Sequence, residues 1–94
     1  MAQFVALGCA TAKTSHENYL ESLRGVVGRD FRTLAEFRRF EPHALPNGNI
    51  EYRWTRQMLR RSKPCTDIFE VDPRTYIILR ADFIGGPDDC VIPI

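Results

Sequence analysis

The spacing of apolar residues changes at Pro42, and this change limits what the chain can fold into. Before Pro42, apolar side chains recur every three or four residues, which is typical of one face of a helix. After it they alternate with polar ones, as in a strand with one buried face. Helices followed by strands predict an α+β domain with an antiparallel sheet. With 94 residues, of which 44% are hydrophobic and 27% charged, the chain has the size and composition of one globular domain.

Two helices are predicted in the first half. Ser15 can cap the first helix, Glu17 suits its first turn, and Gly28 suits its end. The apolar side chains of this helix are Tyr19, Leu20, Leu23, Val26 and Val27. The second helix begins at Asp30 and ends at Pro42, and its apolar side chains are Phe31, Leu34, Phe37 and Phe40. Because a spacing of three drifts around a helix of 3.6 residues per turn, this second helix is expected to be short or partly irregular.

The second half predicts three strands and, as an alternative, a short fourth one at residues 43–46. Asn47 and Gly48 form a turn before the strand that contains Trp54, the next strand spans 65–71, and the last spans 76–83. The side chains expected on the core face of these strands are Ile50, Tyr52, Trp54, Phe69, Val71, Ile77, Leu79, Ala81 and Phe83. The predicted fold is two N-terminal helices packed on a small antiparallel sheet of three or four strands.

The chain has three cysteines, so in an oxidising compartment one of them would stay unpaired. If the strands at 65–71 and 76–83 pair, Cys65 lies opposite the end of the last strand, and the bend after it can bring Cys90 back. A disulfide there would close a loop of about 26 residues and stabilise the fold by about 3.5 kcal/mol. Two reduced cysteines in a cytosolic core are the alternative. Cys9 lies in a stretch without periodicity, where an exposed thiol is a liability unless it is modified.

Three segments resemble small proteobacterial outer-membrane lipoproteins of the SmpA/OmlA (BamE-like) type, over about residues 9–90. They are "FVALGCATAKTSHENYLESLRG", "LPNGNIEYRW" and "CTDIFEVDPRTYIILRADFIGGPDDC". In such proteins two helices precede a small sheet, and a signal peptidase cuts before a cysteine that carries the lipid. The resemblance implies that Cys9 is the lipidated residue and that Cys65 and Cys90 are paired. It also matches Gly48 to the turn glycine and Phe69, Val71 and Asp72 to an "F.VD" motif.

The resemblance implies a division of the chain. Residues 1–8 would be the remnant of a signal-like segment, residues 9–15 a tether, and residues 16–94 a single α+β domain. The domain would then lie at the periplasmic face of the outer membrane, held by acyl chains such as palmitate, with envelope proteins as partners. If Met1 is the native start, the expected location is the cytoplasm and Cys9 is a plain thiol.

The chain shows no pattern typical of an enzyme, so we expect no catalytic activity, metal or cofactor. Ser15 and His16 are adjacent, which makes a nucleophile and base pair difficult, and the phosphate-binding and G-x-S-x-G motifs are absent. His16, His43 and the cysteines lack metal-ligand spacing. Asp88 and Asp89 fit a solvated turn better than a cation site.

The charges are unevenly distributed. Residues 24–63 hold ten Arg/Lys and four Asp/Glu, whereas residues 64–94 hold two and six. Within the basic segment at 53–63, the candidate contacts for an anionic partner are Arg56, Arg60, Arg61 and Lys63. Lipid headgroups, an acidic protein and nucleic acid are the candidate partners, with nucleic acid excluded by a periplasmic location, and a solvated loop is the alternative.

The predicted function is therefore a non-enzymatic cell-envelope lipoprotein with a structural or adaptor role in an envelope assembly. The alternative is a cytosolic binding module whose 53–63 segment contacts nucleic acid or an acidic partner.

Overall fold

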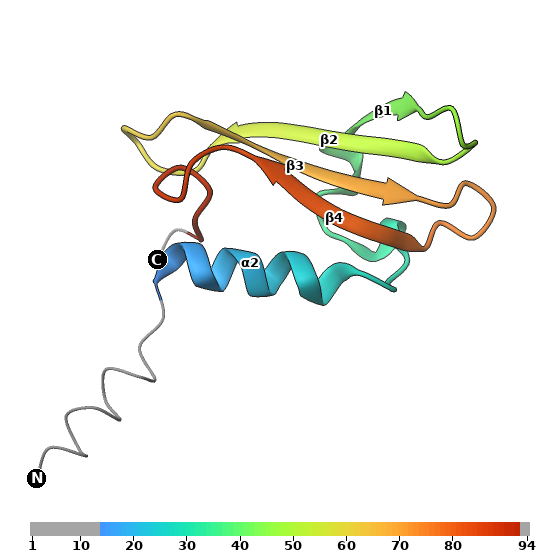
Figure 1. The fold of residues 1–94 in the computed structure, drawn as a ribbon, viewed down its shortest axis with the longest axis horizontal. Coiled ribbons are helices and arrows are strands. Elements are labelled where there is room, and N and C mark those ends of the chain that lie inside the picture. Colours follow the sequence, from blue (N-terminus) through green and yellow to red (C-terminus); the bar gives the residue numbers. More distant parts are fainter. Residues whose placement is uncertain (1–13, 93–94) are drawn as a thin grey trace, which may run out of the picture.

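A computed structural model describes residues 14–92 and shows, within them, one α-helix and a four-stranded antiparallel sheet (Figure 1). The helix and two 3₁₀ turns come first: α2 (Ser15–Val26), η1 (Phe31–Thr33) and η2 (Phe37–Arg39). The strands follow as β1 (Glu41–Ala44), β2 (Ile50–Gln57), β3 (Pro64–Val71) and β4 (Ile78–Ile84). Their order in the sheet is β1-β2-β3-β4, so each strand pairs with its neighbour in sequence. The α+β class is confirmed, and the fourth strand exists at 41–44.

The N-cap of helix α2 lies one residue before the predicted one. Thr14 is the N-cap: its side chain accepts the N–H of Glu17 at 3.0 Å, and the Glu17 carboxylate accepts the N–H of Thr14 at 3.0 Å. The helix ends at Val26, and Gly28, at φ +90°, donates its N–H to the carbonyl of Ile78 at 2.8 Å. The prediction of Ser15 as the cap is therefore wrong by one residue, and Gly28 joins the end of the helix to β4.

The second predicted helix is wrong, because residues 31–39 form the two separate 3₁₀ turns η1 and η2. Leu34, between them, has extended backbone angles (φ −74°, ψ 135°), which interrupt any continuous helix. Within each 3₁₀ turn, side chains three residues apart lie on the same side, and the two pairs with this spacing are Phe31/Leu34 and Phe37/Phe40. Phe31 and Phe40 are buried by this arrangement. The spacing therefore suits the 3₁₀ geometry better than an α-helix.

The predicted core face of the last strand is only half right. Tyr76 has a positive φ of 62°, and the β3–β4 pairing shifts register between Glu70 and Val71. As a result Ile78, which is fully buried, takes the core position expected for Ile77 and Leu79. The register shift moves the following residues of β4 back to the alternation that the sequence predicts, so Ala81 and Phe83 pack against the core.

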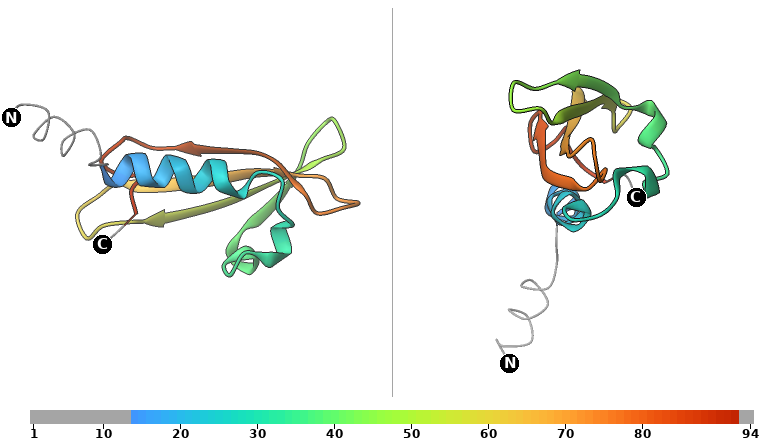
Figure 2. Two further views of the ribbon diagram at one scale, coloured as in Figure 1. Left: turned by 90° about the horizontal axis from the view of Figure 1, so that it is seen from below. Right: turned by 90° about the vertical axis from the view of Figure 1, so that its right-hand side faces the viewer.

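The helix and the η1–η2 segment lie on the same face of the twisted sheet (Figure 2). Helix α2 packs along β4, and Tyr19 and Leu23 are its buried side chains. Phe31 stacks on Tyr52 with ring centroids 4.2 Å apart, so the η1–η2 segment covers the β2 side. No helix within residues 14–92 is long and apolar enough to cross a bilayer.

A disulfide joins Cys65 at the start of β3 to Cys90 in the C-terminal tail. This pairing confirms the prediction from the expected strand order. The tail is thereby held against the beginning of α2, where the N–H of Ile92 donates to the carbonyl of Ser15 at 3.3 Å. The Nδ1 of His16 lies 2.7 Å from the carbonyl oxygen of Cys90, so the side chain of the helix also binds the tail.

Candidate functional site: a cleft with a buried ion pair

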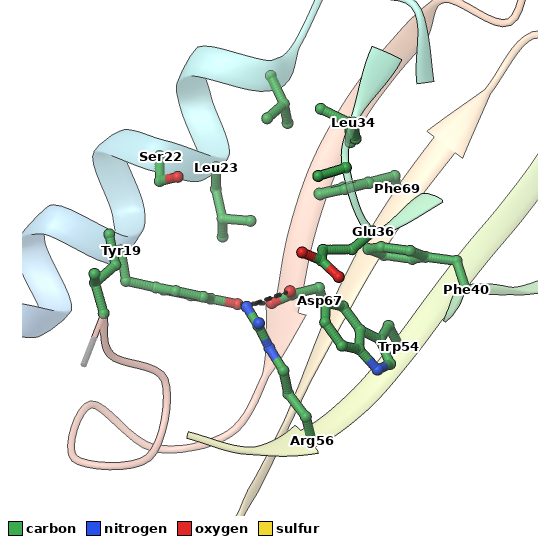
Figure 3. Close-up of a pocket in the computed structure, with 13 residues that line it drawn as sticks. Tyr19, Ser22, Leu23, Leu34, Glu36, Phe40, Trp54, Arg56, Asp67 and Phe69 are labelled. Atoms are coloured by element: carbon green, nitrogen blue, oxygen red, sulfur yellow. Dashed lines mark hydrogen bonds and ion pairs between the residues drawn. The ribbon is translucent and has the colours of Figure 1, made fainter. Parts of the chain in front are cut away.

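A cleft of about 230 Å³ opens between α2 and the η1–η2 segment, above β2 and β3 (Figure 3). Two short 3₁₀ turns cover less of the sheet than a second helix would, and the core face between them and α2 stays open. The apolar lining comes from α2, the 34–40 segment, the sheet and the tail: Leu23, Val26, Leu34, Ala35, Phe40, Trp54, Phe69 and Ile92. The polar lining is Tyr19, Ser22, Glu36, Arg56 and Asp67.

One end of the cleft holds a hydrogen-bonded group of three polar side chains. Asp67 is only 5% exposed and accepts a hydrogen bond from the hydroxyl of Tyr19 on one carboxylate oxygen. Its other carboxylate oxygen accepts a hydrogen bond from the Nη2 of Arg56 at 3.3 Å. Figure 3 shows these three side chains converging from α2, β3 and β2. Helix and sheet are thus joined through a polar contact inside an otherwise apolar core.

Strand pairing explains how Arg56 reaches Asp67. Trp54 pairs with Asp67 across β2 and β3, and Arg56 is the next residue of β2 on the same face. A diagonal neighbour in an antiparallel sheet is within reach of a long side chain. The guanidinium carbon of Arg56 also lies 4.2 Å from the centre of the Trp54 ring, so the cation packs on the indole.

The ion pair is incompletely satisfied. The Nε of Arg56 is buried and, within the described part of the chain, has no hydrogen-bond partner. Its contact with Asp67 uses one nitrogen, whereas a guanidinium can bind a carboxylate with two. Because 40% of the Arg56 side chain is exposed, the pair stands at the border between the cleft and solvent.

Burial controls the protonation of this group. Desolvation raises the pKa of Asp67 above the usual range of an aspartate, while the hydrogen bond from Tyr19 and the charge of Arg56 oppose that rise. Desolvation, followed by the hydrogen bond to Asp67, raises the pKa of Tyr19 well above its usual range. Tyr19 therefore remains a hydroxyl donor, and the carboxylate depends on Arg56 for compensation of its charge.

The lining of the cleft is mainly apolar, with polar groups gathered at one end. Neither described histidine lines the cleft, and His16 is engaged with the tail. Ser22 also lines the cleft, and no described histidine lines it there to act as a base for the hydroxyl. Within residues 14–92 no group of three or more His, Cys, Asp or Glu side chains could hold a metal ion. Apolar walls with a few polar groups at one end are typical of a recognition site.

The structure separates the four predicted anion contacts. Arg56 belongs to the cleft and pairs with Asp67. Arg60 and Arg61 are exposed in the β2–β3 turn, and Lys63 follows it, with its backbone N–H bound to Asp89 at 2.9 Å. These four residues therefore do not form one site. The predicted lipidation site, Cys9, lies outside the described residues.

The sequence analysis missed Tyr19 and Asp67 as members of a polar site. A signal for Asp67 was present, because it alternates with Phe69 and Val71 and so shares their core-facing side of β3. The same alternation carries Arg56 onto the face of Tyr52 and Trp54. Two opposite charges on core-facing positions of neighbouring strands predict a buried pair.

Comparison with models of protein families gives no match. Comparisons with characterised proteins and with solved structures also give none. The resemblance of the sequence to SmpA/OmlA-type lipoproteins therefore remains a prediction.

Proposed function

We propose that this chain is a non-enzymatic adaptor domain of the bacterial cell envelope, tethered to a membrane by a lipid on Cys9. The observation that carries the proposal is the disulfide between Cys65 and Cys90, both of which are fully buried. Disulfides persist in the periplasm and are rare in the cytosol. A small domain with an open cleft gains from such a link, because it has little core to stabilise it otherwise.

The surroundings of the disulfide support a structural role. A Cβ at Gly85 would stand 2.7 Å from the Sγ of Cys90, so the chain passes the disulfide at a distance that only glycine permits. The amide of Cys90 donates to the carbonyl of Gly86 at 2.9 Å, which shapes the tail into a turn in front of the disulfide. The tail is thus fitted around an oxidised cysteine pair.

The start of α2 supports the tether. Four residues separate Cys9 from Thr14, the N-cap of α2, so the helix would begin within about 17 Å of the lipidated residue. Buried acyl carbons contribute about 0.8 kcal/mol per methylene, and two or more chains hold a domain stably at a membrane. An adaptor held in this way needs no catalytic centre, since its work is to keep a partner at the surface.

In this role the cleft is the docking surface. An apolar side chain of the partner would bury itself against Leu23, Leu34 and Phe69, and the Arg56–Asp67 pair at one end would favour one orientation. The envelope location and the cleft are separate parts of the proposal and need separate tests.

The intact mass of the protein from its own host, measured without reducing agent, tests the location. The expected species starts at Cys9, carries added acyl mass and is two hydrogens lighter than the reduced chain. An unmodified chain from Met1 with three titratable thiols would refute the envelope assignment and favour the cytosolic binding module.

Two exposed alanines provide a matched test of the cleft. Ala35 lines the cleft, whereas Ala44 lies in β1 and does not. Ala35→Arg should abolish the cross-linking of envelope partners to this domain in cells, and Ala44→Arg should leave it unchanged. Equal cross-linking by both variants would show that the cleft is not the docking surface.

A further inference from the structure

We propose that the β2–β3 turn is a membrane-facing surface that binds anionic lipid headgroups through Leu59, Arg60, Arg61 and Lys63. The proposal rests on the proposed tether at Cys9 and adds the orientation of the domain and the lipid class. It also replaces the predicted set of four cations, because Arg56 belongs to the cleft and Leu59 takes part.

The turn is held in one shape by its own hydrogen bonds. The side-chain amide of Gln57 donates to the carbonyls of Arg60 (3.0 Å) and Ser62 (2.7 Å). The N–H of Leu59 donates to the hydroxyl of Ser62 at 3.0 Å, and that hydroxyl donates to the carbonyl of Leu59 at 3.0 Å. The polar backbone of the turn is therefore engaged internally, and its side chains are presented outward.

The outward side chains combine charge with an apolar group. Leu59 is 44% exposed, and Arg60, Arg61 and Lys63 are exposed around it. Neither arginine has an ion-pair partner among the described residues. Asp88 and Asp89 lie in the nearby tail, and Asp89 accepts the backbone N–H of Lys63. Three positive side chains and two negative ones leave this end of the molecule with a net charge of one positive unit. An exposed leucine beside unpaired arginines suits the boundary between headgroups and acyl chains.

The turn lies at the same end of the molecule as the beginning of α2 (Figure 1). The same grouping is visible from a second direction in Figure 2. Leu59 lines a shallow hollow together with Thr14 and Ser15, which places the turn beside the helix start. The β3–β4 turn, with Arg74, lies at the opposite end (Figure 1).

This placement favours a lipid surface over an acidic protein. A lipid on Cys9 would hold the start of α2 within about 17 Å of the bilayer, and the turn beside it would share that distance. Attraction to an anionic surface falls off over a Debye length of about 8 Å, and a tether of at most about 17 Å lets the turn come that close. Arg74, at the far end of the molecule, would stay beyond this range.

The test uses the full chain with its disulfide intact and a single myristoyl chain coupled to the thiol of Cys9 through a maleimide. Cys9 is the one cysteine left over from the Cys65–Cys90 pair, so the coupling is selective. A single acyl chain gives marginal, reversible binding, which makes the contribution of the turn measurable. Since the tether is supplied chemically, the result does not depend on whether the host lipidates Cys9, which the intact mass tests.

Partitioning is measured onto neutral phosphatidylcholine vesicles and onto vesicles with phosphatidylglycerol added. The two aspartates offset two of the three cations, so at about fivefold per net charge the unaltered chain should bind the anionic vesicles about fivefold more tightly. The variant Arg60→Gln/Arg61→Gln should bind the anionic vesicles about 25-fold more weakly than the unaltered chain does, and so lose the preference for them. Arg74→Glu changes the net charge by the same amount at the opposite end, where the side chain is 87% exposed, and should lose less than about twofold.

A Leu59→Ser variant should bind both kinds of vesicle more weakly, because the leucine inserts regardless of headgroup charge. Three results would overturn the proposal: no preference for anionic vesicles, equal losses in Arg60→Gln/Arg61→Gln and Arg74→Glu, or a double variant that binds as well as the unaltered chain. Equal losses would show a general effect of net charge.

Discussion

Replacing Arg56 by methionine should destabilise the fold, and the loss should depend on pH. Methionine has an unbranched side chain that can lie beside Trp54 in place of the guanidinium, but it removes the charge that compensates Asp67. The carboxylate would then remain buried with Tyr19 as its hydrogen-bond donor. An uncompensated buried carboxylate is costly, and protonation is the one way to relieve that cost.

The magnitude follows from the geometry. Two unit charges 3.3 Å apart attract by about 5 kcal/mol at an effective dielectric constant of about 20. Removing one partner of a fully buried pair typically costs 3–5 kcal/mol. Arg56 is 40% exposed, so solvent already screens part of the interaction and reduces the expected loss to about 2 kcal/mol at pH 7.

The sign of the pH dependence follows from the raised pKa of Asp67. A carboxyl whose folded-state pKa is raised contributes its stability below its unfolded pKa, near 4, and loses it as the pH rises through the folded value. Without Arg56 the folded-state pKa rises further, because a charge that lowered it is gone. The difference in unfolding free energy between the variant and the unaltered protein should therefore be large at pH 7 and small near pH 4.

Urea unfolding followed by far-UV circular dichroism at both pH values measures this difference. Arg53→Met is the matched control, since Arg53 lies on the same strand and pairs with Glu51 on the outer face. That variant should lose less than about 0.5 kcal/mol at either pH. If Arg56→Met lost the same free energy at pH 4 as at pH 7, the buried charge of Asp67 would not be the cause.

Three further changes test other parts of the fold. Cys65→Ala/Cys90→Ala should lose about 3.5 kcal/mol in urea unfolding, since it opens a loop with a sequence separation of 25, and a loss below 1 kcal/mol would contradict the role of the disulfide. Gly85→Ala should slow formation of the disulfide, because the added Cβ would lie 2.7 Å from the Sγ of Cys90 and the backbone φ of +148° disfavours alanine. A refolding assay with thiol quenching measures this rate, and unchanged kinetics would argue against the close approach. Thr14→Ala should cost about 1 kcal/mol by removing the cap of α2, whereas Thr14→Ser should restore it.

Strands β2, β3 and β4 were predictable because one face of each is at least partly buried, whereas all four residues of β1 are exposed. Alternation on β2 placed Ile50, Tyr52 and Trp54 on the core side, and in the structure Tyr52 and Trp54 pack against the core. On β4 the same rule failed at Ile77 and Leu79, because the left-handed backbone at Tyr76 changes the phase before the strand begins. A local irregularity of this kind leaves no trace in a pattern of apolar residues.

The cleft could not be predicted, because it results from a difference between two helical geometries. Apolar residues spaced by three are compatible with an α-helix whose apolar stripe winds around its axis and with 3₁₀ turns. Tertiary packing selects the 3₁₀ turns in this fold. The charged pair was within reach of the sequence, since Asp67 and Arg56 both occupy core-facing positions. The sequence could not predict that Tyr19 joins this pair, because its hydrogen bond to Asp67 depends on how α2 lies across the sheet.

The cleft, the ion pair and the disulfide depend on one another. Tyr19 and Leu23 are the buried side chains of α2, so apolar packing holds the helix to the sheet over a small area. At its beginning, the helix is held by the tail, through His16 and the carbonyl of Cys90, and the tail is held by the disulfide. The Sγ of Cys65 lies 3.4 Å from the hydroxyl oxygen of Tyr19, so the disulfide also packs against the residue that orients Asp67. An oxidising environment therefore does more than raise the stability of this domain, because it fixes the helix that forms one wall of the cleft.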